Sequence, residues 1–225
     1  MDIPETRYAR TIDGLSIAYQ VLGQGPVDLV YSEAWISNVD ARWDVPGFGA
    51  FFRQLASISR LILFDRRGSG LSDRPTQVES LALEHGVDDL RAVMDATESE
   101  RAVLFGFEDG GMLAGMFAGT HPDRTIALVL FAPWAKALKT PDWPFGWTEA
   151  EQDEWDRHVA AEWGTMAFAR RIVSIASPGR ERDEDFVEAL ARYHRACASP
   201  AAVRAMDAMH MEIDARPSDC LALAV

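Results

Sequence analysis

The chain has 225 residues, of which 48% are hydrophobic and 25% charged, and its formal net charge at pH 7 is −13. This length suffices for one large domain with a sizeable hydrophobic core. The acidic excess argues against binding of a nucleic-acid backbone, because the long-range electrostatic interaction would be repulsive. No apolar run approaches the roughly 20 residues that cross a bilayer, so we expect no membrane partner.

Neither a targeting signal nor redox chemistry is indicated. The first five residues, MDIPE, lack the basic and apolar regions of a signal peptide. Cys197 and Cys220 have neither the spacing of metal ligands nor a secretory context. We therefore expect reduced thiols in a cytoplasmic protein, with no metal ion and no organic cofactor.

Short apolar runs alternate with amphipathic segments through the first 131 residues. Their composition and periodicity predict strands at residues 7–11, 15–21, 27–31, 61–64, 102–107 and 125–131. Helical spacing of apolar residues predicts helices at residues 48–58, 81–96 and 110–120. Strands that alternate with helices predict an α/β fold, with a mostly parallel sheet covered by helices on both faces.

The composition changes at Ala132-Pro133. The following segment carries five of the seven tryptophans and is expected to form several helices without intervening strands: Trp134, Trp143, Trp147, Trp155 and Trp163. We therefore divide the chain into an α/β core at residues 1–132, a helical lid at residues 133–215 and a tail at residues 216–225. The apolar end of that tail, Leu221–Val225, could form a short strand.

The most informative stretch is VLFGFEDGG, residues 103–111, in which an apolar run breaks into a glycine-framed turn and then a helix of small residues. This is the pattern of a nucleophile elbow, with the nucleophile between two glycines. Glu108 stands at the centre instead of serine, and a carboxylate cannot become an alkoxide. Glu108 is the candidate catalytic residue, without the usual serine chemistry. Gly110, Gly111 and Gly115 are expected to let the helix approach the sheet.

These segments together resemble the α/β-hydrolase fold, most closely the hydrolase-like domain that precedes class III nucleotide cyclases in bacteria. The motifs that carry the resemblance are LILFDRRGSGLSD at residues 61–73, the elbow, HPDR at residues 121–124 and WPFGWT at residues 143–148. The resemblance implies oxyanion-hole positions at Trp35 and Asp109. It also implies a pocket that includes Glu33, Ala34, Phe107 and Trp134.

The chain departs from this pattern in ways that bear on activity. Glu33 brings a carboxylate to the loop where an oxyanion would be stabilised. The family's acid follows strand 7 and its histidine follows strand 8. The chain ends soon after the lid, so we expect that segment to be absent. Strand 125–131 would then be an edge, covered by Leu221–Val225, by a second copy or by another partner.

Several site residues allow two interpretations. Glu33, Glu108 and Asp109 either recruit a cation or are drifted positions in a site no longer selected for catalysis. Arg66-Arg67 either bind an anion or hold their turn. The lid tryptophans either line an apolar pocket or only pack. The lid histidines, His158, His194 and His210, are expected on helix surfaces.

Two functions follow. The first is a catalytically impaired regulatory module that binds a small apolar ligand or a partner. The second is a hydrolase of a small apolar ester, epoxide or halide. That enzyme would use Glu108 as nucleophile or base, as dehalogenases and epoxide hydrolases of this fold use Asp. Glu108 is one methylene longer than Asp, which moves its oxygens by about 1 Å, and the usual histidine is missing.

Overall fold

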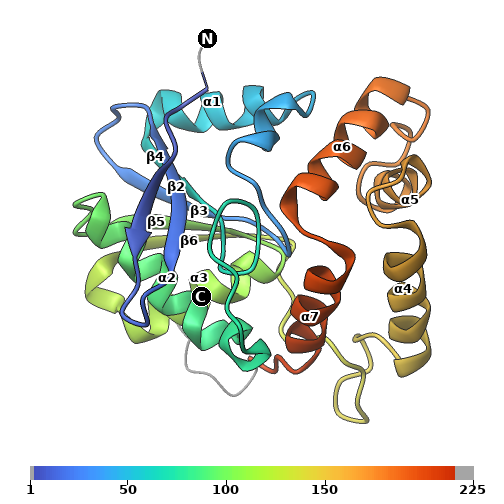
Figure 1. Ribbon diagram of the computed structural model, residues 1–225. Coiled ribbons are helices and arrows are strands. Elements are labelled where there is room, and N and C mark those ends of the chain that lie inside the picture. Colours follow the sequence, from blue (N-terminus) through green and yellow to red (C-terminus); the bar gives the residue numbers. More distant parts are fainter. Residues whose placement is uncertain (1–2, 216–225) are drawn as a thin grey trace.

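The computed structural model describes residues 3–215 and contains one six-stranded sheet of order β1-β2-β4-β3-β5-β6 (Figure 1). Strands β3 to β6 are parallel to one another, whereas β1 and β2 are antiparallel to their neighbours. The strand bounds are β1 Arg7–Arg10, β2 Ser16–Leu22, β3 Asp28–Ser32, β4 Arg60–Phe64, β5 Ala102–Phe107 and β6 Thr125–Phe131.

Helices cover both faces of this sheet. Helix α1 (Phe48–Ile58) packs through Phe52 on the face that carries Tyr31 and Leu63. Helices α2 (Leu83–Ala96) and α3 (Asp109–Thr120) pack on the other face, in a core built from these residues: Val30, Ile62, Leu90, Leu104 and Leu113. The central strands are buried on both faces, which explains their continuous apolar runs. The predicted mostly parallel α/β architecture is confirmed.

Four further helices stand beside the sheet, and Figure 1 shows them as a separate group. They are α4 (Glu149–Glu162), α5 (Met166–Ala176), α6 (Glu184–Cys197) and α7 (Pro200–Met211). The side chains of Thr148, Thr165, Asp183 and Ser199 cap their N-termini. Trp163, Phe168 and Leu190 are buried in this part of the chain. They form one cluster with Ile36 and Val45 from the loop after β3. This core fixes the four helices against the carboxyl end of the sheet.

Most predicted boundaries agree with the structure to within one or two residues. Helix α1 and strands β5 and β6 have the predicted bounds. Helix α2 begins two residues later than predicted. The preceding residues Val78–Leu81 form the short 3-10 helix η2, and Ala82, with ψ 152°, does not have a helical backbone. Two other 3-10 helices, η1 (Ala41–Asp44) and η3 (Pro122–Arg124), lie in loops. The strand expected at residues 221–225 lies outside the described residues.

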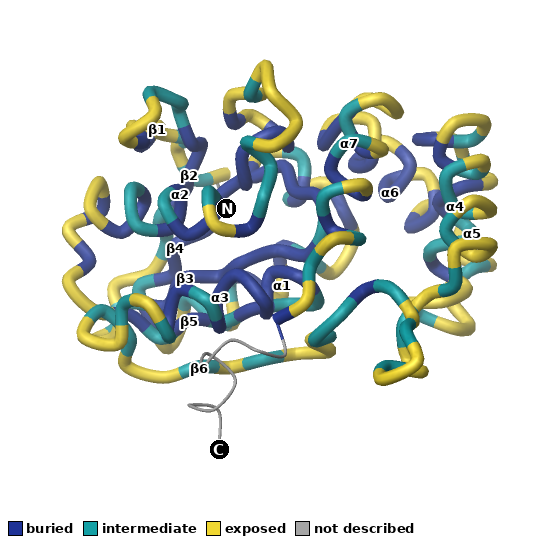
Figure 2. The backbone as a smooth tube through the Cα atoms, turned by 90° about the horizontal axis from the view of Figure 1, so that it is seen from below, coloured by how far each residue is buried: buried dark blue, intermediate teal, exposed yellow. Residues whose placement is uncertain are grey.

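Strand β6 is an edge of the sheet within residues 3–215. Figure 2 shows the contrast between the buried central strands and β6, which is intermediate or exposed along its length. Ile126, Val129 and Phe131 are each more than two-fifths exposed. The described helices include none that is long and apolar enough to cross a membrane.

Candidate functional site

A sharp turn joins β5 to α3, and Glu108 stands at its apex. Glu108 has φ 50° and ψ −119°, a conformation with positive φ that L-residues rarely adopt. Its N–H donates to the carbonyl of Phe131, and its carbonyl accepts from the N–H of Gly111, both at 2.9 Å. We call residues 106–110 the Glu108 turn.

The turn needs glycine at two positions. A β-carbon on Gly106 would overlap the backbone of Gly111, and one on Gly110 would overlap the carbonyl oxygen of Ser32. The close approach expected at Gly110 is therefore confirmed. The same expectation for Gly115 is wrong, since a β-carbon there would meet no atom within 4 Å.

The carboxylate of Asp109, the next residue, is buried and has three polar neighbours. Its Oδ1 accepts from the backbone N–H of Trp35 at 2.5 Å. Its Oδ2 accepts from Nη1 of Arg66 at 2.5 Å and lies 3.2 Å from Nε2 of His210. Burial raises the pKa of Asp109, but His210, Arg66 and the Trp35 N–H outweigh it, so the pKa lies below its ordinary value. The group is an ionised carboxylate at neutral pH.

This arrangement occupies the Trp35 N–H, which the sequence assigned to the oxyanion hole. An oxyanion hole stabilises a substrate's developing negative charge through donors that are free to bind it. Here a side-chain carboxylate already holds that donor. A substrate oxyanion would have to displace Asp109 and lie close to its negative charge.

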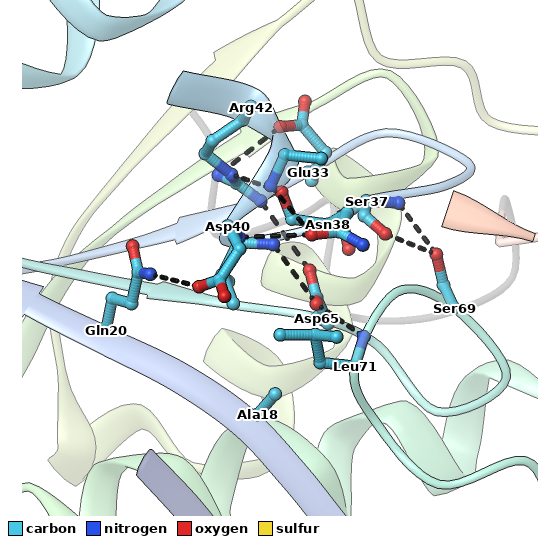
Figure 3. Close-up of polar contacts among 12 residues, drawn as sticks. Ala18, Gln20, Glu33, Ser37, Asn38, Asp40, Arg42, Asp65, Ser69 and Leu71 are labelled. Carbon is cyan, nitrogen blue, oxygen red and sulfur yellow. Dashed lines mark hydrogen bonds and ion pairs between the residues drawn. The ribbon is translucent and has the colours of Figure 1, made fainter. Parts of the chain in front are cut away.

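The side chain of Glu33 belongs to a buried polar network that includes Arg42 and Asp65 (Figure 3). Its Oε2 lies 3.5 Å from Nη1 of Arg42, and the hydroxyl of Tyr31 donates to its Oε1 at 3.4 Å. Arg42 is fully buried and also lies 3.8 Å from Oδ1 of Asp65. Oδ2 of Asp65 in turn accepts from the N–H of Val39 and that of Leu71. Burial raises the pKa of Glu33, and Arg42 opposes that shift.

The three carboxylates considered together from the sequence therefore have different partners. Glu33 pairs with Arg42, Asp109 pairs with Arg66, and Glu108 remains at the turn. Within residues 3–215 there is no group of three or more His, Cys, Asp or Glu side chains able to hold a metal ion. The cation interpretation of this trio gains no support.

Arg66 and Arg67 both form ion pairs within the protein. Arg66 binds Asp109, as described above, whereas Nη2 of Arg67 pairs with Asp89 at 2.6 Å and its Nη1 pairs with Asp13 at 2.9 Å. The structural interpretation of the pair thus accounts for both guanidinium groups.

A cavity of about 380 Å³ lies between the Glu108 turn and helices α4 to α7. Aromatic side chains form much of its wall. The rings of Trp35 and Trp155 have centroids 5.4 Å apart, and those of Trp147 and Trp155 meet at 89° with centroids 5.9 Å apart. The other lining residues include Trp134, Phe145, Lys136, Ile172, His194 and Met211.

Three carboxyl groups line this cavity, those of Glu108, Asp109 and Asp207. Burial, with smaller contributions from Asp109 and Glu33, raises the pKa of Glu108. Burial raises the pKa of Asp207 to about 7, although Nε1 of Trp155 donates to its Oδ2 at 3.0 Å. The cavity therefore combines apolar walls with acidic groups whose charge depends on what binds there.

Two lid histidines differ from expectation, since His194 and His210 are buried rather than on helix surfaces. Burial lowers the pKa of each to about 4, so both are neutral at pH 7. His210 contacts Asp109 and Arg66, with its Nε2 3.3 Å from Nη2 of Arg66. The local sequence carried no signal for this contact, because Asp109 and Arg66 lie in segments far from His210 along the chain.

The predicted site residues separate into two groups. Trp35, Glu108, Asp109 and Trp134 line the cavity. Glu33, Ala34 and Phe107 lie outside its lining, and Phe107 stacks on Phe131 with ring centroids 5.5 Å apart. The tryptophans after residue 132 follow both interpretations. Trp134, Trp147 and Trp155 line the cavity. Trp163 is instead buried in packing and donates to the carbonyl of Ala198.

A protein-family model described as "alpha/beta hydrolase fold" matches residues 43–193. Among curated proteins, the chain is 32% identical to mouse (Mus musculus) "Epoxide hydrolase 4" over 78 residues, which is 35% of this chain and 22% of that protein. It is 34% identical to "AB hydrolase superfamily protein YisY" of Bacillus subtilis (strain 168) over 97 residues, 42% of this chain and 35% of that protein. The matched stretches thus span well under two thirds of these relatives.

The fold itself is similar to solved structures over nearly the whole chain. An esterase from Exiguobacterium antarcticum superimposes with a TM-score of 0.74 at 18% identity, covering 95% of this chain and 76% of that one.

Proposed function

The chain belongs to the α/β-hydrolase fold family, and from this membership we propose that it binds a small ligand without hydrolysing it. The ligand would occupy the cavity between the Glu108 turn, taken as the family's nucleophile elbow, and helices α4 to α7, taken as a lid. The role would be regulatory, as the resemblance to cyclase-associated domains implies.

The hydrogen bond from the Trp35 N–H to Asp109 is the observation that carries this proposal. Acyl-transfer enzymes of this fold depend on such donors, and loss of a single donor typically lowers the rate by a factor on the order of 10² to 10³. In this chain the donor is retained but bound to a carboxylate, which Arg66 holds in place. Catalysis would have to break the hydrogen bond between the Trp35 N–H and this carboxylate in every turnover.

The position of His210 supports the same proposal. A hydrolase needs an imidazole that activates the nucleophile or a water molecule. Nε2 of His210 contacts Asp109 and Arg66. No hydrogen bond or ion pair joins Glu108 to a histidine within residues 3–215.

A second candidate function is hydrolysis of a small apolar ester, epoxide or halide with Glu108 as nucleophile or base. One observation favours it, since Glu108 lies in the same aromatic cavity as His210, where a substrate could reach both. Against it, the raised pKa of Glu108 shifts this group toward its protonated form, which is a poor nucleophile.

The two functions are separated by incubating the purified protein with p-nitrophenyl acetate, p-nitrophenyl butyrate and styrene oxide. We expect rates equal to those of a protein-free blank. The matched comparison is Glu108→Gln, which removes the charge and keeps the shape. Turnover that exceeds the blank and disappears in Glu108→Gln, with unchanged circular dichroism, would establish the hydrolase instead.

A further inference from the structure

Building on the proposed ligand-binding function, we propose that the cavity takes an organic cation, namely an alkylammonium or quaternary ammonium group attached to an apolar body. Such a ligand suits the aromatic walls of the cavity, its dimensions and two lining carboxyl groups that form no ion pair with an arginine or a lysine within the described residues.

Aromatic side chains from several elements line the cavity. The rings of Trp147 and Trp155 meet at 89°, and the ring of Trp35 is tilted by 55° against that of Trp155 with centroids 5.4 Å apart. Trp134 and Phe145 also belong to the lining. The face of an indole ring attracts a cation, and aromatic cages of this kind bind quaternary ammonium groups in other proteins.

The charges of the lining are unbalanced toward the acidic side. Asp109 is neutralised by Arg66, and the lining cation Lys136 pairs with Asp214 at 3.0 Å. Within the described residues, neither Glu108 nor Asp207 forms an ion pair with an arginine or a lysine. An anionic ligand would be repelled by both carboxylates. A neutral ligand supplies no counter-charge, so it would favour the protonated forms of Glu108 and Asp207, whereas a cation favours their ionised forms.

The rest of the cavity suits the apolar part of such a ligand. Ile172, Ile175, Ala176 and Met211 contribute aliphatic lining. A volume of about 380 Å³ admits a ligand of small-molecule size and falls in the range of ordinary ligand pockets. An ammonium ion with an aromatic or branched alkyl substituent would fill both parts of the site.

Three probes of similar size and different charge test the inference by isothermal titration calorimetry. They are benzyltrimethylammonium, neutral 4-tert-butylphenol and anionic 4-tert-butylbenzoate. We expect the cation to bind at least about tenfold more tightly than the neutral probe, and the anion to show no measurable binding.

Variants then locate the cation. Glu108→Gln and Asp207→Asn each remove one charge with little change of shape, and Trp147→Leu removes one ring face at a partly exposed position. Each is expected to weaken binding of benzyltrimethylammonium by about tenfold. Glu188→Gln makes the same charge change on the exposed surface of α6, where Glu188 pairs with Arg192, and should leave the affinity unchanged.

The outcomes distinguish this inference from the proposed function. If 4-tert-butylphenol binds as tightly as the cation, or if the cation binds equally to all the variants, the cation inference is overturned and non-hydrolytic binding stands. Absence of binding by all three probes overturns the inference as well. Ester or epoxide turnover that depends on Glu108 overturns the proposed function alone, because a hydrolase could still select cationic substrates.

Discussion

The backbone N–H of Trp35 donates a hydrogen bond to Oδ1 of Asp109 at 2.5 Å, and these are the two residues for which the family resemblance predicts an oxyanion hole. Arg66 binds the other oxygen of the same carboxylate. The donor predicted for the oxyanion hole is therefore bound to a carboxylate of the protein itself.

Glu108→Ser alone is expected to leave the protein without esterase activity. The new hydroxyl would stand at the apex of the turn, but the Trp35 N–H would still be bound to Asp109, and His210 would still be engaged with Asp109 and Arg66. The measurement is hydrolysis of p-nitrophenyl acetate together with covalent labelling by a fluorophosphonate. Labelling of the Glu108→Ser variant that is lost when His210→Ala is added would contradict this expectation.

Arg66→Met is expected to destabilise the fold by about 3 kcal/mol, because it leaves the buried carboxylate of Asp109 without its main partner. The double variant Arg66→Met with Asp109→Leu should lose much less than the sum of the two single changes. Arg91→Met is the matched control. Arg91 pairs with Asp88 on the surface, so its loss should cost less than about 1 kcal/mol. Urea unfolding measures all four, and additive losses would show that Arg66 and Asp109 are not coupled.

Affinity for benzyltrimethylammonium is expected to rise by about tenfold between pH 6 and pH 8, as Asp207 loses its proton. Burial raises the pKa of Asp207 to about 7, and the nearby carboxylates of Asp156 and Asp109 act in the same direction, while the hydrogen bond from Trp155 opposes the shift. A bound cation favours the ionised carboxyl. Below pH 7 binding must therefore release a proton, and the affinity falls.

Asp207→Asn should flatten that pH profile. His194 and His210 stay neutral over the same range, since burial lowers the pKa of each to about 4. Calorimetry in buffers of different ionisation enthalpy counts the protons released. An affinity in the wild type that does not change with pH would exclude Asp207 as the responsible group.

Strand β6 is expected to promote self-association, because it is an edge strand of residues 3–215 with exposed apolar side chains. Val129→Lys places a charge on this strand and should shift the protein toward monomer in sedimentation velocity experiments. Ile12→Lys is the matched control, since Ile12 is exposed next to β1, at the opposite edge of the sheet. Equal sedimentation of the wild type and Val129→Lys would count against a role for β6.

The fold could be predicted from the sequence because its signals are local. The run Leu61–Phe64 has no polar residue, and a strand buried on both faces requires that. The small residues after Glu108 likewise indicated the close packing of α3 against the sheet. Such patterns depend on residues that lie only a few positions apart, so a single sequence is enough to detect them.

The site could be predicted only in part, since its contacts join distant segments. The turn at Glu108 and the approach of Trp35 and Asp109 followed from the motifs. The partners of Asp109 did not follow from the motifs. The sequence left Arg66 either binding an anion or holding its turn, and it predicted His210 on a helix surface. Only the packing of α7 against the core brings His210 to Asp109. The aromatic cavity likewise depends on how the lid helices dock.

The backbone of Glu108 has a consequence for recognition. Holding a side chain at positive φ costs about 1–3 kcal/mol, and the surrounding structure must impose it. A backbone constrained in this way cannot shift toward an ill-fitting molecule. Molecules that reach Glu108 thus meet a turn whose backbone is set in advance by the scaffold, which lowers the entropy lost in ordering this backbone on association and narrows the range of shapes accepted.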